Sequence, residues 1–479
     1  MSERVFCIDF GSAYTKVALR RDPGAQAELI NNPTRRAAEL DFCVPSVALV
    51  DRTAKPNRAE FGPAVFGRQE GNGINIYHNW KRYLFADVTT TGEITTPPLD
   101  ALLQSDQFRE LAERFGVSGA QVGHLQQLVS NARGLFGVTP ARALSAEAGW
   151  QAFAAKLAYY FFRWLREYIL SACGHVREAA LNPEAIPVRL TVPAFAHGSG
   201  VGTHPGCAAL TDALARAGWP LHPTRPVVSE PYSNVIGVLT EGANVVHNSR
   251  LQLRRMFREG PIILTLSKPE DHPTYRAWSI DVGAFTTDFA ALSLDTKGAL
   301  TDDHETAIRV THHSVPLGVS VLDRRVLAVL PTDQREWLEK HAQPLDWEDF
   351  RSRVYTSGRP LNTAAVGTIG GPDSRDQIDA VLRAFGSELA AACADFRAQQ
   401  SPPIEHQELI LTGGGNAIPA VHEALTAAMQ AGGSSFVHVY IPTPGRRAGP
   451  DRARRLGEPL TRGGSALGGA SIYFERNYY

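Results

Sequence analysis

Short apolar runs alternate with segments of helical periodicity along most of the chain. Strand patterns cover 4–10 and 15–20, with a tight turn at Gly11 between them, and a further apolar run covers 43–50. The other expected strands are at 188–196, within 277–294, at 306–315 and at the start of 408–429; helices are expected at 101–115, 150–172, 207–219, from Pro231 to 239, at 319–330, at 376–399 and at the end of 408–429. Strands that alternate with helices predict the α/β class with mixed sheets.

One pattern occurs near the start of each half of the chain. Residues 7–19 read CIDFGSAYTKVAL, and residues 279–292 read SIDVGAFTTDFAAL. Each contains Ile-Asp-x-Gly inside a strand–turn–strand pattern. A duplicated α/β unit with two facing hairpins would place the carboxylates of Asp9 and Asp281 on opposite sides of a cleft. Extra residues near 88–150, which begin with a polar and Pro-bearing stretch, and a poorly patterned stretch at 241–276 indicate insertions, which are natural partner surfaces.

Length, net charge and cysteine content limit the kinds of protein that this chain is expected to be. A chain of 479 residues is expected to form about two to four domains, and its net charge of −1 gives no reason to expect nucleic acid or an anionic membrane as partner. The five cysteines are scattered without metal-ligand spacing, which is typical of reduced thiols in a cytoplasmic protein. No secretory signal is visible at the start, and the apolar helix at 154–170 carries too many charges to span a membrane.

Glycine-bearing turns next to aspartates suggest phosphate chemistry. A glycine turn presents backbone N–H groups to an anion, and Ser12 and Thr286 add hydroxyl donors. A carboxylate beside a phosphate needs a divalent cation between them, and Mg²⁺ takes one or two carboxylates while keeping several waters. The alternative is that Asp9 and Asp281 only cap tight turns. A third turn, LTGGGNAIP at 411–419, joins an apolar strand to a helix.

Seven segments in order resemble the nucleotide-binding domain of the 70-kDa heat-shock (DnaK-type) chaperones, within the actin, chaperone and sugar-kinase superfamily. The matching segments are VFCIDFGSAYTKVAL, NWKRYLF, LTVPAFA, VVSEPYSN, SIDVGAFTTDF, PLGVSVLDRRVL and LTGGGNAIP, which together span nearly the whole chain. The resemblance implies an actin-like fold with lobe I at 1–240 and lobe II at 241–479 around a nucleotide cleft.

The resemblance also implies residue roles in binding ATP or ADP with Mg²⁺. Lys81 and Glu230 would stabilise the γ-phosphate and orient the attacking water, with Asp281 and Thr286 as the other catalytic residues. Asp9, Asp281 and Asp288 would hold the metal through water. Nucleotide contacts are expected from Gly11, Ser12, Ala13, Tyr14, Gly283, Ala284, Gly318, Gly413, Gly414, Gly415 and Asn416.

Several positions depart from the family pattern. Ala284 and Phe285 replace glycines of the second phosphate loop, and Ala417 stands where the chaperones stack an arginine on adenine. Arg351 and Arg353 are candidate substitutes for that arginine. We expect no peptide-binding domain in this chain, and we expect partner contacts through the insertions. The leading hypothesis is a chaperone-like ATPase whose lobe closure regulates a partner protein. The alternatives are an actin-like filament or scaffold protein, a nucleotide-binding pseudo-ATPase, and a small-molecule kinase.

Overall fold

The protein is described by a computed structural model. It describes residues 4–21, 27–30, 42–55, 58–65, 68, 71, 73–78, 80–88, 146–175, 186–193, 204–241, 274–295, 308–342, 344–400, 406–431, 436, 438–442, 453–456 and 458–471. The helix expected at 101–115 and most of the two insertions lie outside these residues. Over the described part, strands and helices alternate in the mixed α/β arrangement that the sequence predicts.

The first large sheet is built from the N-terminal strands and has the order β3-β2-β1-β8-β9, with β4 also paired to β2. Its strands are β1 (Val5–Phe10), β2 (Tyr14–Arg20), β3 (Ala27–Leu29), β4 (Val44–Pro45), β8 (Val188–Val192) and β9 (Val227–Ser229). The β1–β2 hairpin is antiparallel, whereas β8 pairs in parallel with β1 on its other side.

The second large sheet uses the later strands in the order β12-β11-β10-β15-β16-β17. Its strands are β10 (Thr274–Val282), β11 (Thr287–Asp295), β12 (Ile308–Val315), β15 (His406–Thr412), β16 (His438–Pro442) and β17 (Ala453–Leu456). Again an antiparallel hairpin, β10–β11, is followed on the other side of its first strand by a parallel neighbour, β15. The two sheets therefore repeat one topology, and both expected hairpins are confirmed.

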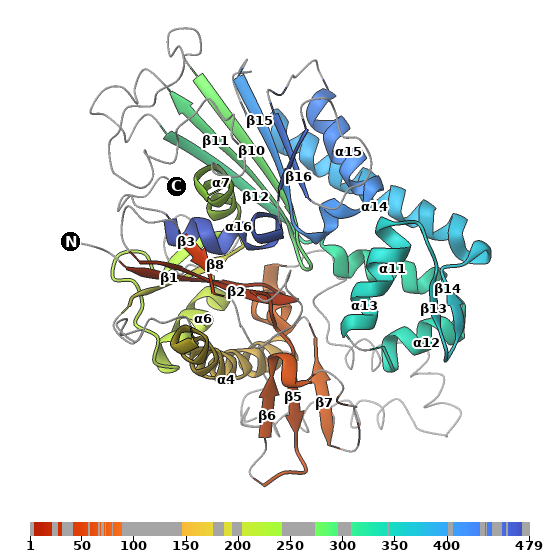
Figure 1. Cartoon of the computed structure of the whole chain (residues 1–479), viewed down its shortest axis with the longest axis horizontal. Helices are drawn as coiled ribbons and strands as arrows, with labels where there is room; N and C mark the ends of the chain where they lie inside the picture. Colours follow the sequence, from red (N-terminus) through yellow and green to blue (C-terminus); the bar gives the residue numbers. More distant parts are fainter. Residues whose placement is uncertain are drawn as a thin grey trace, which may run out of the picture.

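Two helices connect these sheets. The helix α7 (Glu230–Glu241) follows the last strand of the first sheet but packs on β10, β11 and β12 of the second. The C-terminal helix α16 (Glu458–Ser471) follows the last strand of the second sheet but packs on β1, β2 and β3 of the first. Figure 1 shows the two helices side by side between the sheets. A Cβ on Gly468 would lie 1.6 Å from the Ser233 carbonyl oxygen, so only glycine permits this close backbone contact.

The outer face of the first sheet is covered by α4 (Ala146–His175) and α6 (Pro205–Arg216). The rings of Phe161 and Phe162 are fully buried, with centroids 5.5 and 5.3 Å from that of Phe10. This confirms that the aromatic face of the helix expected at 150–172 packs inward. None of the described helices is long and apolar enough to cross a membrane.

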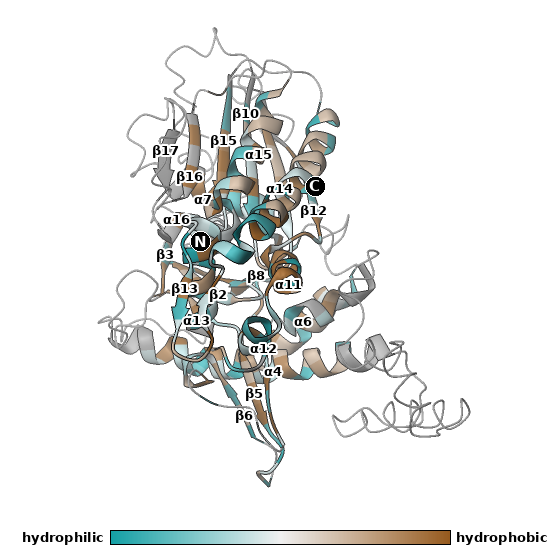
Figure 2. Cartoon of the chain, turned by 90° about the vertical axis from the view of Figure 1, so that its right-hand side faces the viewer, coloured by the Kyte–Doolittle hydropathy of each residue, from teal (hydrophilic) through white to brown (hydrophobic). Residues whose placement is uncertain are grey.

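The remaining elements lie at the periphery of the two sheets. A small sheet combines β5 (Ala48–Asp51), β6 (Arg58–Phe61) and β7 (Ile74–Tyr77), so the apolar run at 43–50 divides between two sheets. The strands β13 (Leu361–Thr363) and β14 (Gly367–Ile369) form a separate hairpin. The helices of the second half are α11 (Val319–Val329), α12 (Thr332–Lys340), α13 (Pro344–Phe350), α14 (Pro372–Ala398) and α15 (Pro419–Gln430). In Figure 2, α11 is largely brown and α12 is teal, and most of the described α12 side chains are exposed or half-buried whereas α11 has several buried ones.

Candidate functional site

Asp9 lies near the end of β1, where three strands of the first sheet meet. Its register partners are Lys16 on β2 and Thr191 on β8. The Lys16 ammonium forms an ion pair with Asp9 Oδ2 at 3.0 Å, and the Thr191 hydroxyl donates to Oδ1 at 3.1 Å. Burial alone would lower the pKa of Lys16, but the attraction of Asp9, with smaller contributions from Cys43 and Asp281, raises it above its ordinary value. Asp9 is therefore paired on both oxygens.

The loop between β1 and β2 contains the first group of expected nucleotide contacts. The Gly11 N–H donates to the Asp9 carbonyl at 3.1 Å, and the Ala13 carbonyl accepts from the Ser46 N–H at 2.9 Å. Ser12 is buried, Ala13 is exposed, and the Tyr14 hydroxyl donates to Glu348 at the far side of the loop. The loop thus exposes Ala13, and its bonds to Ser46 and Glu348 both lie at its second end, at Ala13 and Tyr14.

Asp281 occupies the corresponding place at the end of β10. Its register partners are Asp288 on β11 and Thr412 on β15. Asp288 accepts from the Thr286 hydroxyl at 2.8 Å and from the Ser314 hydroxyl. Thr286 therefore donates to a carboxylate in this structure, and its proposed contact with a γ-phosphate would require the hydroxyl to turn.

The charge on this second hairpin is not balanced locally. Burial raises the pKa of Asp281 to about 8, with the negative charges of Asp288, Asp9 and Glu230 acting in the same direction and Lys16 opposing them. Burial also raises the pKa of Asp288, although its hydrogen bonds from Ser314 and Thr286 favour the charged form. These mutual effects place the carboxylates of both hairpins within electrostatic range of each other.

The loop after Asp281 is held by the start of α11. The carbonyls of Gly283 and Ala284 accept from the N–H groups of Val319 and Ser320, both at 2.9 Å. A Cβ on Gly318 would lie 2.5 Å from the backbone of Ala284 and Phe285, so Gly318 serves here to let the helix approach the loop.

The side chain of Phe285 is 5% exposed and belongs to the hydrophobic core. It therefore anchors the second loop to the protein interior. The aromatic ring occupies the core side of the loop, which leaves the other side to the small residues Gly283 and Ala284.

The third loop follows β15 and packs directly beneath Asp281. Gly413 has φ +79°, and a Cβ there would lie 2.2 Å from Asp281 Oδ1, whereas Gly414 faces open space. A Cβ on Gly415 would meet the Val282 side chain at 2.2 Å. The buried Asn416 amide donates to the Ile280 and Thr412 carbonyls at 2.9 and 2.5 Å. Gly414 is therefore the member of this loop most open to a ligand.

Lys81 and Glu230 form an ion pair, although 149 residues separate them. The Lys81 ammonium in the segment Trp80–Val88 lies 2.7 Å from Glu230 Oε1 at the start of α7, and the side chains are 3% and 13% exposed. Burial raises the pKa of Glu230 to about 7 against the attraction of Lys81, and the charges of Asp288 and Asp9 add to the rise. The pair thus lies within range of both hairpins.

Two residues at this place were not expected from the sequence. Lys16 and Thr191 both contact Asp9. The signal for Lys16 was present, since it follows Asp9 at the spacing by which Asp288 follows Asp281. The two arginines expected as adenine partners each pair with an acid: Arg351 donates two hydrogen bonds to Asp323, at 3.1 and 2.6 Å, and Arg353 binds Asp349 at 2.8 Å.

Among the described residues, no three His, Cys, Asp or Glu side chains are placed to bind one ion together.

A scan against models of known protein families and a search of curated proteins both return no match for the chain. The residues of the three loops and the Lys81–Glu230 pair are therefore the basis for a proposed function.

Proposed function

We propose that the chain has an actin-like fold of two lobes and binds Mg²⁺ and ATP between its two hairpin loops. The observation that carries this proposal is the repeated hairpin: each places an Asp at the same register position, beside a glycine turn and a threonine of a parallel strand. The crossing of α7 and α16 between the two sheets supports a two-lobe arrangement, because each helix links one sheet to the other.

The donor set fits a divalent cation. Asp281 and Asp288 are adjacent carboxylates whose pKa values are raised first by burial and further by the negative charges around them. A Mg²⁺ ion held through water by these groups, with Asp9 nearby, would relieve that imbalance. When bound, such an ion neutralises charge on the phosphates and helps to align them.

Hydrolysis then depends on the positions of a few side chains. The oxygen of a water forms a bond to the γ-phosphorus, the bond from that phosphorus to the bridging oxygen breaks, and ADP and phosphate leave with one proton released. Glu230 orients the water, Lys81 stabilises charge on the γ-phosphate, and Thr286 donates to a phosphate oxygen. Such positioning and electrostatic effects supply most of the rate enhancement in phosphoryl transfer.

Changes of nucleotide state would alter how the two lobes close and so regulate a partner protein, in the manner of a chaperone-like switch. The alternatives stay open as experimental outcomes. A protein that binds ATP without hydrolysing it would be a pseudo-ATPase, and one that sediments as a polymer with ATP would be a filament or scaffold protein.

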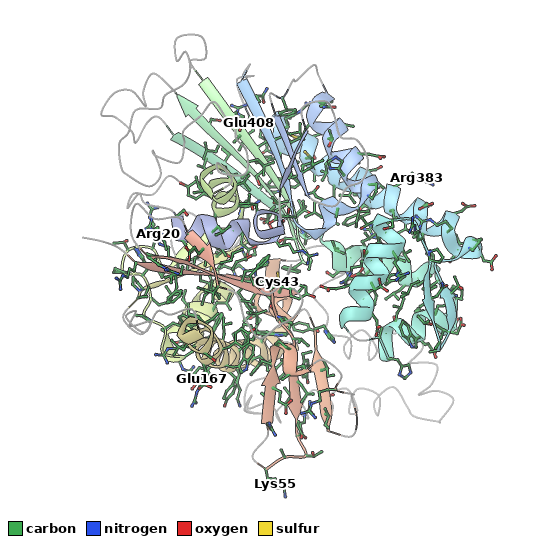
Figure 3. All side chains as sticks on the ribbon, in the orientation of Figure 1. Arg20, Cys43, Lys55, Glu167, Arg383 and Glu408 are labelled. Carbon is green, nitrogen blue, oxygen red and sulfur yellow. The ribbon has the colours of Figure 1, made fainter. Side chains whose placement is uncertain are left out.

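The test combines calorimetric titration with ATP and a phosphate-release assay on the same preparation. We expect Lys81→Ala and Glu230→Gln to lower turnover by about a hundredfold, the size typical for loss of one transition-state contact. The controls are Lys55→Ala and Glu167→Gln, at exposed positions that Figure 3 labels away from both hairpins. Wild-type turnover in both site variants, or no nucleotide binding by the wild-type protein, would refute the proposal.

A further inference from the structure

Asn234 lies one helical turn after Glu230 on α7 and is bonded to the second sheet. It is 1% exposed, and its amide donates to the Ser279 hydroxyl at 3.0 Å and to the Thr412 hydroxyl at 2.5 Å. Ser279 is two positions before Asp281 on β10, and Thr412 is the register partner of Asp281 on β15. Side chains at these positions share one face of a sheet. Asn234 therefore fastens the helix of Glu230 to the face and the strand ends that carry Asp281.

Thr412 also connects this amide to the third loop. Its hydroxyl accepts from Asn234, and its carbonyl accepts from the side-chain amide of Asn416 in the loop at 2.5 Å. Gly413 follows Thr412 directly, and nothing lies within 4 Å of a Cβ placed on Gly414. A ligand at Gly414 would therefore contact a loop that is bonded, through Thr412, to α7.

A second connection joins the third loop to Glu230 through α16. The Gly413 N–H donates to the Thr461 carbonyl at 3.0 Å. One helical turn later, the Ser465 hydroxyl donates to the Glu230 carbonyl at 3.4 Å. Thr461 and Ser465 are each 5% exposed. Both connections thus run through the interior, from the third loop to the residue proposed to orient the attacking water.

We propose that these hydrogen bonds make hydrolysis at Glu230 depend on occupation of the third loop, with Asn234 as the positioning residue. The inference rests on the proposed function, in which the nucleoside end of ATP lies at the third loop. Asn234 touches no part of the nucleotide and acts by holding α7, and with it Glu230, in place relative to that loop. Recognition of the nucleoside then raises the rate of phosphate release, so a nucleoside triphosphate is the preferred substrate over a bare polyphosphate.

The experiment measures kcat and KM for ATP and for inorganic tripolyphosphate, which has the phosphates but no nucleoside, both in excess Mg²⁺. Wild-type protein should turn over ATP at least about tenfold faster than tripolyphosphate. Asn234→Ala and Thr412→Val should each lower kcat for ATP about five- to tenfold, the effect of one lost hydrogen bond. The KM for ATP should stay within about threefold, because the lost bond does not contact the ligand.

Ser279→Ala is the matched control, because it removes the other hydrogen bond of the same amide and leaves the bond to Thr412 in place. It should leave kcat for ATP at the wild-type value. Thr412→Ser keeps the hydroxyl and should also retain wild-type kcat. Urea denaturation checks that each variant folds. If Asn234→Ala does not fold, the comparison of Thr412→Val with Thr412→Ser and Ser279→Ala decides the question.

Equal losses of kcat in Ser279→Ala and Thr412→Val, or equal wild-type kcat for ATP and tripolyphosphate, would overturn the inference and leave the proposed function intact. A wild-type protein that binds ATP but releases no phosphate from it would overturn the inference and the hydrolytic part of the proposed function. A wild-type protein that binds no ATP would overturn both entirely.

Discussion

The hairpins β1–β2 and β10–β11 have the same backbone pairing but differ in the charge of the residue that faces the Asp. In each, an Asp near the end of the first strand faces the residue seven positions later on the second strand. That residue is Lys16 opposite Asp9 and Asp288 opposite Asp281. One register position therefore holds an ion pair in the first sheet and two acids in the second.

This difference shows that hairpin pairing and charge are independent properties of the repeat. Backbone hydrogen bonds and alternating apolar side chains define the register, and they place whatever side chain stands there toward the same end of the sheet. The consequence appears in the pKa of Asp281, which burial and the neighbouring acids raise to about 8. The first hairpin is complete without a metal, whereas the second is not.

The loops also differ in how they are held. The first loop exposes Ala13 and is tied to Ser46 and Glu348 at its second end, through the Ala13 carbonyl and the Tyr14 hydroxyl. The second loop is bonded to the start of α11 and anchored in the core by Phe285. The first loop is therefore the more open of the two, and the second is the more firmly fixed.

Removing one Asp from each hairpin should have opposite effects on stability. Asp9→Asn leaves the buried Lys16 ammonium without its partner charge, and we expect a loss of about 3 kcal/mol, the lower end for breaking a buried ion pair. Asp281→Asn removes repulsion from Asp288 and should stabilise the ligand-free protein by about 1 kcal/mol at pH 8. Urea denaturation measures both, and equal destabilisation by the two variants would contradict the assigned charge difference.

The second hairpin should make the ligand-free protein less stable as the pH rises. Asp281 titrates at 3.8 in the unfolded chain and at about 8 in the folded one, so between these values the folded state holds a proton that the unfolded state has released. Raising the pH through this window removes stability, by at most about 1.4 kcal/mol per pH unit for each such group. Glu230, with a pKa raised to about 7, acts in the same direction.

The measurement is the free energy of unfolding at several pH values between about 5 and 8, with and without Mg²⁺. Wild-type stability should fall across this range, Asp281→Asn should flatten the fall, and Mg²⁺ should restore stability at pH 8 but not at pH 5. A wild-type stability that rises with pH over the same range would show that the carboxylates are not held as described.

The sequence predicted the local parts of this arrangement well. The two hairpins and the α/β class follow from alternating apolar positions and Gly turns, which depend on neighbouring residues only. The helices at 150–172, 319–330 and 376–399 are confirmed as α4, α11 and α14 with somewhat different ends. Elements with weaker apolar periodicity, such as α12 and the hairpin β13–β14, were not expected.

The long-range parts were harder to anticipate. The pairing of Lys16 with Asp9 depends on hairpin register, and the packing of α7 on the second sheet depends on a crossing that no local pattern encodes. Phe285 is a further example. In the sequence it interrupts the glycines expected in a phosphate loop, and only its burial in the core identifies it as an anchor.

The smallest expected effect concerns the two glycines that follow the aspartates. A Cβ on Gly11 would lie 2.3 Å from the Tyr14 carbonyl oxygen, whereas one on Gly283 would have its nearest contact at 3.1 Å, with the Thr286 carbonyl oxygen. Gly11→Ala should therefore cost about 1–3 kcal/mol, as overpacking does, and Gly283→Ala less than about 1 kcal/mol. Gly414→Ala is the matched control, because nothing lies within 4 Å of its added Cβ. Urea denaturation of the three variants decides the matter: if Gly283→Ala proves as costly as Gly11→Ala, the second loop is no roomier at this position than the first, and the difference between the hairpins is one of charge alone.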